Sequence, residues 1–522
     1  MPNIDSRGIS FLVNYCKSLL ILSLFILLGA LFFYPAFKIG FLGDFAGDFF
    51  TSQFGWFDFA AYQWNFYLPV MMLYYCLYKA FHLSSPAYQV FHLALIFINA
   101  WLVYLLAQEL QFKSWQCWIA GLLALFNSAA FETYYWLSTI PKVLATSFGL
   151  MALIFLCRLR QRLAWVWAWG YLIMVTLGMA IESTGLILPL LGLILDSHFG
   201  LWRGAGKGKS TLFAGLKLHL WSFSITGVFL VVRHFLGIKP YAENLPVIQK
   251  FLTFGRTILS TFSHGLSDHL WLELKGIPLL PVILTLLLST ILVMAWYVKH
   301  GPDKSRFITL LLLWLGASLP HTIGSHFHSR YLYFPGVFAA LVLAELMGSF
   351  RLHRWARNGT RVAVALVVIG YLAWDGYFFR QSLSNYLEAS RIYDAGIKKI
   401  KTNLPEIPPG SRLLLIDFPD KIIRPRHIPQ GNPTRYRVLI YRNALPHHLN
   451  LLYQKPNINL TMVRLSPPSD DNPDPLGTPS SPEEVAKLAA APQTMTCRYL
   501  SGDPGKFVIV RNTFRHDSPT KK

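Results

Sequence analysis

Charged side chains are scarce in this sequence. Asp, Glu, Lys and Arg make up 14% of its 522 residues, whereas a soluble globular chain carries about 25%. The deficit falls before residue 380, in apolar runs with little or no charge. Runs of about 20 apolar residues cross a bilayer as single helices. The scarcity of charge therefore excludes a soluble protein over roughly the first three quarters of the chain.

Cysteine and acidic residues are also few. The chain has five cysteines and no Cys-x-x-Cys pair, which argues against a disulfide framework and a metal–thiolate site. Its 26 acidic residues stand against 47 basic ones, giving a net charge of +21. The basic residues lie in short loops between the apolar runs, whereas nucleic-acid-binding proteins carry them as a patch on one soluble face. No nucleic-acid partner is therefore predicted.

The apolar runs number about eleven by the length criterion. Their connections alternate between an aromatic, polar set and a basic set, which includes Arg158, Arg160 and Arg306. Basic loops of membrane proteins stay in the cytoplasm. The N-terminus is therefore predicted inside and, after an odd number of spans, the C-terminal part outside. The predicted spans are 14–36, 86–108, 115–131, 141–157, 163–180, 181–196, 212–235, 277–298, 306–323, 331–350 and 362–379.

Residues 62–82 are apolar enough to suggest a twelfth span. A span here would invert every later loop and place the basic loops outside. The segment is rich in Trp and Tyr, which favour the membrane–water interface. It is therefore predicted as a helix that lies in the outer interface.

The composition changes after residue 380. Residues 382–402 are predicted as a helix, and the Pro- and Ser-rich segment 466–482 as a mobile loop. The predicted fold is an all-α polytopic membrane domain over residues 1–379, with about eleven transmembrane helices. A small extracytoplasmic α/β domain over residues 380–522 follows it. Its predicted strands are Arg412–Phe418, Arg437–Tyr441, Asn459–Leu465 and Phe507–Arg511.

Two carboxylates follow directly on the first span. Asp44 and Asp48 lie in GDFAGDFF and are four positions apart, so on a helix they would share a face. They can be solvated loop residues or helix caps. The loop around them is strongly apolar, which favours a functional interpretation. A carboxylate there can take a proton from a hydroxyl acceptor or hold a cation.

Further ionisable residues are predicted at the outer ends of spans, where they are candidates for binding substrate. Glu132 and Glu182 can alternatively cap helix N-termini. The cations are Lys142, Arg233 and Arg330. Snorkelling is the alternative for each, whereas Arg suits a lipid-linked phosphate by its bidentate fork.

Three histidines lie in PHTIGSHFHSRYLYFP, at positions 321, 326 and 328. Their spacing fits no compact zinc motif, and no carboxylate or cysteine accompanies them. No metal site is predicted there. His328 is instead predicted to line a polar, substrate-binding cavity.

Several segments resemble, in order and spacing, the polytopic glycosyltransferases of the GT-C fold. The resemblance points to the bacterial and TMTC-like branch, which uses polyprenyl-phosphate-linked sugars, and covers about residues 15–350. The matching segments are GDFAGDFF, FYLPVMMLYYCLY, YQVFHLALIFINAWLVYLLAQEL, AGLLALFNSAAFETYYWLSTIPKVLATSFGLMALIFLCR, IESTGLILPLLGLILD and SRYLYFPGVFAALVLAEL.

The resemblance implies a donor bound at the outer membrane surface and an inverting transfer of its sugar to a hydroxyl acceptor. Asp44 or Asp48 would take the acceptor proton, and the outer cations would stabilise the leaving phosphate. The implied partners are the lipid-linked sugar donor and membrane lipids, in a bacterial inner (plasma) membrane. No cofactor is assigned, and a divalent cation stays open.

The sequence departs from the family pattern at three places. Leu68 stands where the family often has the Arg of Tyr-Arg-Pro, Phe126-Asn127 where it often has His-Pro, and Ile181 where it tends to have Lys. Either Lys142, Arg233 and Arg330 hold the donor instead, or activity has been lost. The alternative is therefore an inactive GT-C-like membrane protein that assists envelope polysaccharide assembly or transport. A transporter is disfavoured because the chain shows no internal repeat.

Overall fold

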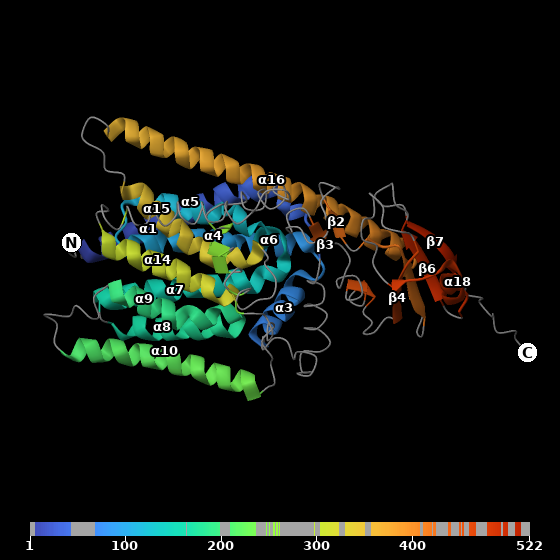
Figure 1. Cartoon of the computed structure of the whole chain (residues 1–522), viewed down its shortest axis with the longest axis horizontal. Helices are drawn as coiled ribbons and strands as arrows, with labels where there is room; N and C mark the ends of the chain where they lie inside the picture. The colour runs from blue at the N-terminus through green and yellow to red at the C-terminus, as the bar shows by residue number, and fades with distance from the viewer. Residues whose placement is uncertain are drawn as a thin grey trace, which may run out of the picture.

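The computed structural model arranges long helices side by side in a bundle (Figure 1). The N-terminus lies at one end of this bundle and the C-terminal domain beyond the other, so we name them the N-terminal end and the domain-side end. The structure describes residues 6–42, 68–162, 164–198, 209–235, 303–322, 329–349, 357–407, 411–419, 421–423, 437–439, 448–449, 452–453, 459–465, 478–491, 494–499 and 507–512, with single residues and pairs between 247 and 261 and at 297.

Helices dominate the described part of the first 403 residues. Short 3-10 helices (η) connect many of them at the domain-side end. The helical elements are α1 (Ser6–Phe33), η1 (Tyr34–Lys38), α3 (Leu68–Phe81), α4 (Ser85–Glu109), α5 (Ser114–Leu125), η2 (Ser128–Ala130), α6 (Phe131–Tyr135), η3 (Leu137–Thr139), α7 (Ile140–Arg162), α8 (Trp165–Ile181), η4 (Ser183–Ile187), α9 (Leu188–His198), α10 (Lys209–Phe235), α14 (Lys304–Ser318), η5 (Leu319–Thr322), η6 (Ser329–Leu332), α15 (Tyr333–Ser349) and α16 (Arg357–Asn403).

The helices confirm a multi-pass membrane protein but not the predicted number of spans. Within the described residues, five segments are long and apolar enough to cross a membrane. The predicted span 277–298 lies outside the described residues, Tyr297 excepted. The apolar helices α8 and α9 are shorter than the usual span. The five are Cys16–Lys38, Ser85–Glu109, Leu137–Gln161, Leu216–Phe235 and Ser329–Gly348.

The spans differ in how deeply they are buried. In α7 and α15, 72% of the most apolar window is buried inside the protein, whereas in α10 only 17% is. α10 therefore leaves most of its apolar surface uncovered by the described protein, as a lipid-facing helix does. α7 and α15 therefore form the interior of the bundle, and α10 lies at its margin.

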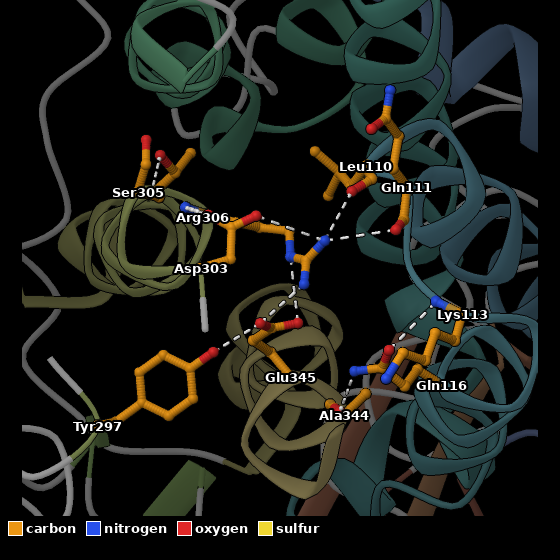
Figure 2. Close-up of polar contacts among 11 residues, drawn as sticks. Leu110, Gln111, Lys113, Gln116, Tyr297, Asp303, Ser305, Arg306, Ala344 and Glu345 are labelled. Atoms are coloured by element: carbon orange, nitrogen blue, oxygen red, sulfur yellow. Dashed lines mark hydrogen bonds and ion pairs between the residues drawn. The ribbon is translucent and has the colours of Figure 1, made fainter. Parts of the chain in front are cut away.

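Carboxylates tie down basic residues at the N-terminal end. The guanidinium of Arg306, on α14, lies 2.9 Å from a Glu345 oxygen and donates to the carbonyl groups of Leu110, at 3.5 Å, and Gln111, at 3.3 Å (Figure 2). Tyr297 donates its hydroxyl to Glu345 at 2.6 Å. Arg306 was predicted only as a loop cation, yet it joins three segments of the bundle.

The segment predicted to lie in the interface contains α3. This helix has 14 residues, too few to span a bilayer. It lies at the domain-side end of the bundle (Figure 1). Its length and place agree with an interfacial helix. Residues 62–67 of the predicted segment lie outside the described residues.

One helix joins the bundle to the C-terminal domain. α16 runs unbroken for 47 residues from the N-terminal end of the bundle into that domain (Figure 1). The predicted span 362–379 and the predicted soluble helix 382–402 are thus one element. No proline interrupts residues 357–404, and the helix ends just before Leu404, which precedes Pro405 and is therefore disfavoured in helical geometry.

The C-terminal domain contains a five-stranded sheet of order β5-β4-β1-β6-β7. The central strand β1 (Arg412–Ile416) is parallel to both β4 (Asn459–Arg464) and β6 (Thr494–Tyr499). The remaining elements are β7 (Phe507–Asn512), which is antiparallel to β6, β5 (Thr478–Pro479), the pair β2 (Lys421–Ile423) and β3 (Arg437–Leu439), and the helix α18 (Pro482–Ala490).

The four predicted strand segments all contain strands, while β6 and α18 were not predicted. The predicted loop 466–482 is wrong at its end, because residues 478–479 pair with β4. Its residues 466–477 lie outside the described residues. α18 begins with a capping box between Ser481 and Glu484. The sequence SPEE matches the capping-box pattern, so this helix start could have been predicted.

We expect reporter fusions to confirm the predicted orientation. Fusions at Gly206 and Gly301 should report cytoplasm, and a fusion after Asn512 should report the outside, because basic loops stay in the cytoplasm. Paired alkaline phosphatase and fluorescent protein fusions would measure this. A cytoplasmic signal after Asn512 would contradict the assignment of the domain-side end to the outer face.

Candidate functional site

Half of the predicted site residues lie in one cluster at the domain-side end. Glu132 comes from α6, Lys142 from the first turn of α7, Glu182 from the start of η4 and Arg330 from η6. We call these four residues, with Trp136 and Tyr331, the charged cluster. Short helices supply most of it, because the chain reverses direction at this end of the bundle.

Glu132 fastens η6 to α6. Its side chain is buried, and its Oε2 accepts the backbone N–H of Arg330 at 3.1 Å, across 198 residues of sequence. The backbone N–H of Glu132 donates to Ser329 Oγ at 3.3 Å, and Thr133 Oγ1 donates to the Arg330 carbonyl at 3.4 Å. The Glu132 carboxylate therefore positions the segment that carries Arg330.

Lys142 and Glu182 form an ion pair. Lys142 Nζ lies 3.1 Å from Glu182 Oε1, and Ser183 Oγ donates to the same oxygen at 3.2 Å. The side chains are 18% and 10% exposed. Glu182 stands at the N-cap of η4 but makes no capping hydrogen bond there. Glu182 thus does not cap this helix with its side chain, which contacts Lys142 and Ser183 instead.

Aromatic rings connect the two cations. Tyr331 lies between them, with its ring centre 5.0 Å from Lys142 Nζ and 5.3 Å from the Arg330 guanidinium carbon. The ring of Trp136 lies 4.4 Å from the same carbon. These are cation–π distances, worth about 0.5–2 kcal/mol each. Neither ring was predicted as a site residue, although Trp and Tyr at the end of a span are a recognised signal of the membrane–water interface.

Polar side chains of α4 hold α6 in place. His92 Nε2 bonds to the Thr133 carbonyl, and Gln89 Nε2 donates to the Tyr135 carbonyl at 3.4 Å. A carbonyl only accepts, so Nε2 carries the proton of His92. Both side chains are fully buried. They fix the backbone of α6 and, through it, the position of Glu132.

α16 covers the other side of α6. Tyr135 donates its hydroxyl to the Phe379 carbonyl at 3.1 Å, and the Tyr386 ring lies 5.3 Å from the Tyr135 ring. Burial raises the pKa of Tyr386 well above its usual value, and the Glu132 carboxylate adds to the shift. The phenol is therefore neutral at physiological pH.

The remaining predicted site residues are not part of this cluster. Arg233 lies half-buried in the last turn of α10, which packs against α8 and α9. No hydrogen bond or ion pair between described residues joins it to the other candidates. Asp44, Asp48 and His328 lie outside the described residues. The described segment nearest to the two aspartates is 39–42.

The charged cluster holds two carboxylates and two cations. An anionic ligand could bind the guanidinium of Arg330, which lies beside the rings of Trp136 and Tyr331. At Lys142 it would have to compete with the Glu182 carboxylate. The cluster can therefore bind an anion at Arg330 and at Lys142, where the anion would displace Glu182. Among the described residues, no three His, Cys, Asp or Glu side chains converge as metal ligands.

No protein-family model matches the chain, and no curated protein matches it. Among solved structures, it is similar to the crystal structure of ArnT from Cupriavidus metallidurans in the apo state. The sequence identity is 12% and the TM-score 0.45, over 94% of this chain and 93% of that chain. Similarity at this level does not assign the chain to a family.

Proposed function

We propose that this protein is a GT-C-type membrane glycosyltransferase. It moves a sugar from a polyprenyl-phosphate donor to a hydroxyl acceptor at the outer face of the membrane. The proposal rests on the charged cluster, where two cations and two aromatic rings lie at one end of a set of apolar helices. Arg binds phosphate through two parallel N–H···O bonds. When the polyprenyl chain of such a donor lies in the bilayer, its phosphate lies at the membrane surface, where the apolar helices end.

The reaction places one group on each side of the sugar. The acceptor oxygen attacks the anomeric carbon, the carbon–oxygen bond to phosphate breaks, and its electron pair leaves with the phosphate. Asp44 or Asp48 takes the acceptor proton. Arg330 and Lys142 stabilise the charge that develops on the departing phosphate. Attack opposite to the leaving group inverts the configuration of the sugar.

Two observations favour the alternative, an inactive protein on the same scaffold that assists envelope polysaccharide assembly or transport. Glu182 already neutralises Lys142. One position where the family tends to have Lys is also closed to solvent, because Ile181 is 5% exposed. On this alternative the charged cluster only stabilises the domain-side end of the bundle.

Arg330→Ala is expected to raise the KM for the donor about 10- to 100-fold, because it removes charge-assisted bonds worth about 1.5–3 kcal/mol. Glu132 binds the backbone of Arg330, so the main-chain contact survives the substitution. The assay follows consumption of a panel of polyprenyl-phosphate sugars in membranes with matched protein levels. Arg380→Ala changes an exposed arginine of α16 and is the control.

The wild-type protein decides between the two functions. Consumption of at least one donor by the wild type, lost or weakened in Arg330→Ala, supports the transferase. If the wild type consumes no donor from a broad panel, the non-enzymatic alternative holds. If Arg330→Ala and the control give the same KM as an active wild type, the cluster does not bind the phosphate.

A further inference from the structure

The segment that leads into the predicted catalytic loop is held by α16. Residues 39–42 follow η1 and are buried. The backbone N–H of Gly40 donates to Ser390 Oγ at 2.6 Å, a bond that spans 350 residues of sequence. Gly40 lies four positions before Asp44. A side chain of α16 therefore fixes the backbone of the segment 39–42.

Ser390 is itself oriented by its neighbours. It is 1% exposed. Because its oxygen accepts from Gly40, its single proton points elsewhere, and the acceptors in reach are Asp394 Oδ2 at 3.3 Å and the Lys38 carbonyl at 3.4 Å. A Cβ added to Gly40 would lie 2.8 Å from Asp394 Oδ1. Glycine at this position lets the backbone approach α16 closely.

The C-terminal domain covers the next residue. The ring of Phe41 lies 5.6 Å from the ring of Tyr88, on α4, and 5.8 Å from the ring of His448, in the domain. Tyr393, on α16, hydrogen-bonds to His448 Nδ1 at 2.6 Å, and the two rings stack at 5.5 Å. Burial lowers the pKa of His448 to about 4, so the ring is neutral at physiological pH.

We infer that the C-terminal domain and α16 act together as a clamp that positions the segment 39–42, which leads along the chain to Asp44. The clamp consists of Ser390, Asp394, Tyr393 and His448, and it holds Gly40 and Phe41. This inference rests on the proposed function, because its effect on catalysis is to place Asp44. A displacement of a catalytic group by about 1 Å can cost on the order of 100-fold in rate. The clamp residues are positioning residues, since none is assigned a contact with substrate.

α16 gives the clamp a second role in the site. One stretch of this helix holds Gly40 through Ser390 and packs on α6 through Tyr386 and Phe379. α6 carries Glu132, which fixes the segment of Arg330. A single helix, α16, therefore contacts both the segment 39–42, which precedes Asp44 in the sequence, and the element that carries Glu132.

The contact is tested by disulfide trapping in the full chain. Gly40→Cys and Asp394→Cys are combined in a background where Cys16 and Cys76, the exposed cysteines, are serine. The Cβ–Cβ separation that a disulfide needs is about 3.5–4.5 Å. Mild oxidation should join the two halves of a chain cut at a protease site inserted after Gly206. The control pair, Gly40→Cys with Arg391→Cys, should not crosslink. If the test pair crosslinks no better than this control pair, the inference is overturned.

The effect is tested with Ser390→Ala, Ser390→Thr and His448→Ala. Ser390→Ala and His448→Ala should lower kcat about 10- to 100-fold and leave the donor KM unchanged, because the donor cations lie in the charged cluster. Ser390→Thr keeps the hydroxyl and should restore most of the activity. Val485→Ala, a core truncation in the same domain away from the clamp, should leave kcat unchanged.

Hydrogen exchange separates this inference from the proposed function. His448→Ala and Ser390→Ala should speed amide exchange of residues 39–42, whereas Val485→Ala should not. An inactive wild type would refute the transferase, and the exchange and crosslinking results would then decide the clamp alone. Wild-type kcat and unchanged exchange in both clamp variants would refute the clamp while leaving the transferase intact.

Discussion

Asp44→Asn is expected to lower turnover about 100-fold or more, the usual loss for a general base. Asparagine keeps the shape of the side chain and removes its basicity, so the change separates chemistry from folding. Asp44 is nearer than Asp48 to the first span and to Gly40, which Ser390 anchors. A base held by a rigid element keeps its geometry better than one further into the loop. The measurement is the rate of donor consumption at saturating donor.

Asp48→Asn is the matched comparison for Asp44→Asn. Only one of two carboxylates four positions apart can stand against the acceptor hydroxyl, so the two variants should differ. The second carboxylate would orient the acceptor or hold a cation. A larger loss in Asp48→Asn would exchange the two roles. Full turnover in both variants, beside an active wild type, would remove the outer-loop base from the mechanism.

Periodicity and length predicted the parts of the fold that depend on local sequence. Apolar runs located the long helices, and strand-like runs located β1 and β4. The predicted boundary at residue 380 missed the continuity of α16, because hydropathy changes there while helix propensity does not. β6 was not predicted, although Thr494–Tyr499 is as long as β4. Its place beside β1 depends on tertiary contacts that no local pattern records.

The candidate site was predicted in its residue types and not in its pairings. Charge at span ends identified Glu132, Lys142, Glu182 and Arg330. That Glu182 pairs with Lys142 and that Glu132 binds the η6 backbone follows from the packing of distant segments. The contact between Gly40 and Ser390 carries no sequence signal, since a buried serine on a helix is common.

The carboxylates at the N-terminal end were overlooked for a related reason. The topology rule counts basic residues, so Arg158, Arg160 and Arg306 were treated as loop charges. Each of them pairs with a carboxylate of a neighbouring helix, with Glu109, Asp196 and Glu345 respectively. An acidic residue near the end of an apolar helix is costly unless it is paired. This cost is the signal from which the pairs could have been predicted.

We expect the buried carboxylate of Asp196 to attach α10 to α7 and α9. The Arg160 guanidinium binds both oxygens of Asp196, and His219, on α10, lies with its Nε2 2.5 Å from the same carboxylate. Asp196 is fully buried and His219 is 3% exposed. α10 buries only 17% of its most apolar window. The polar tie through Asp196 therefore joins α7, α9 and α10 where apolar packing contributes little.

Asp196→Ala should lower the free energy of unfolding by about 3–5 kcal/mol, because it leaves the half-buried charge of Arg160 without its partner. Asp196→Ala combined with Arg160→Met removes both charges, and should recover a large part of that loss. Equilibrium unfolding in mixed detergent micelles measures the wild type, both single variants and the double variant as one cycle. Additive losses in the double variant would show that the two residues do not stabilise the bundle as a pair. Coupling between them, with donor consumption retained in the double variant, would assign this end of the bundle to stability and leave the chemistry at the domain-side end.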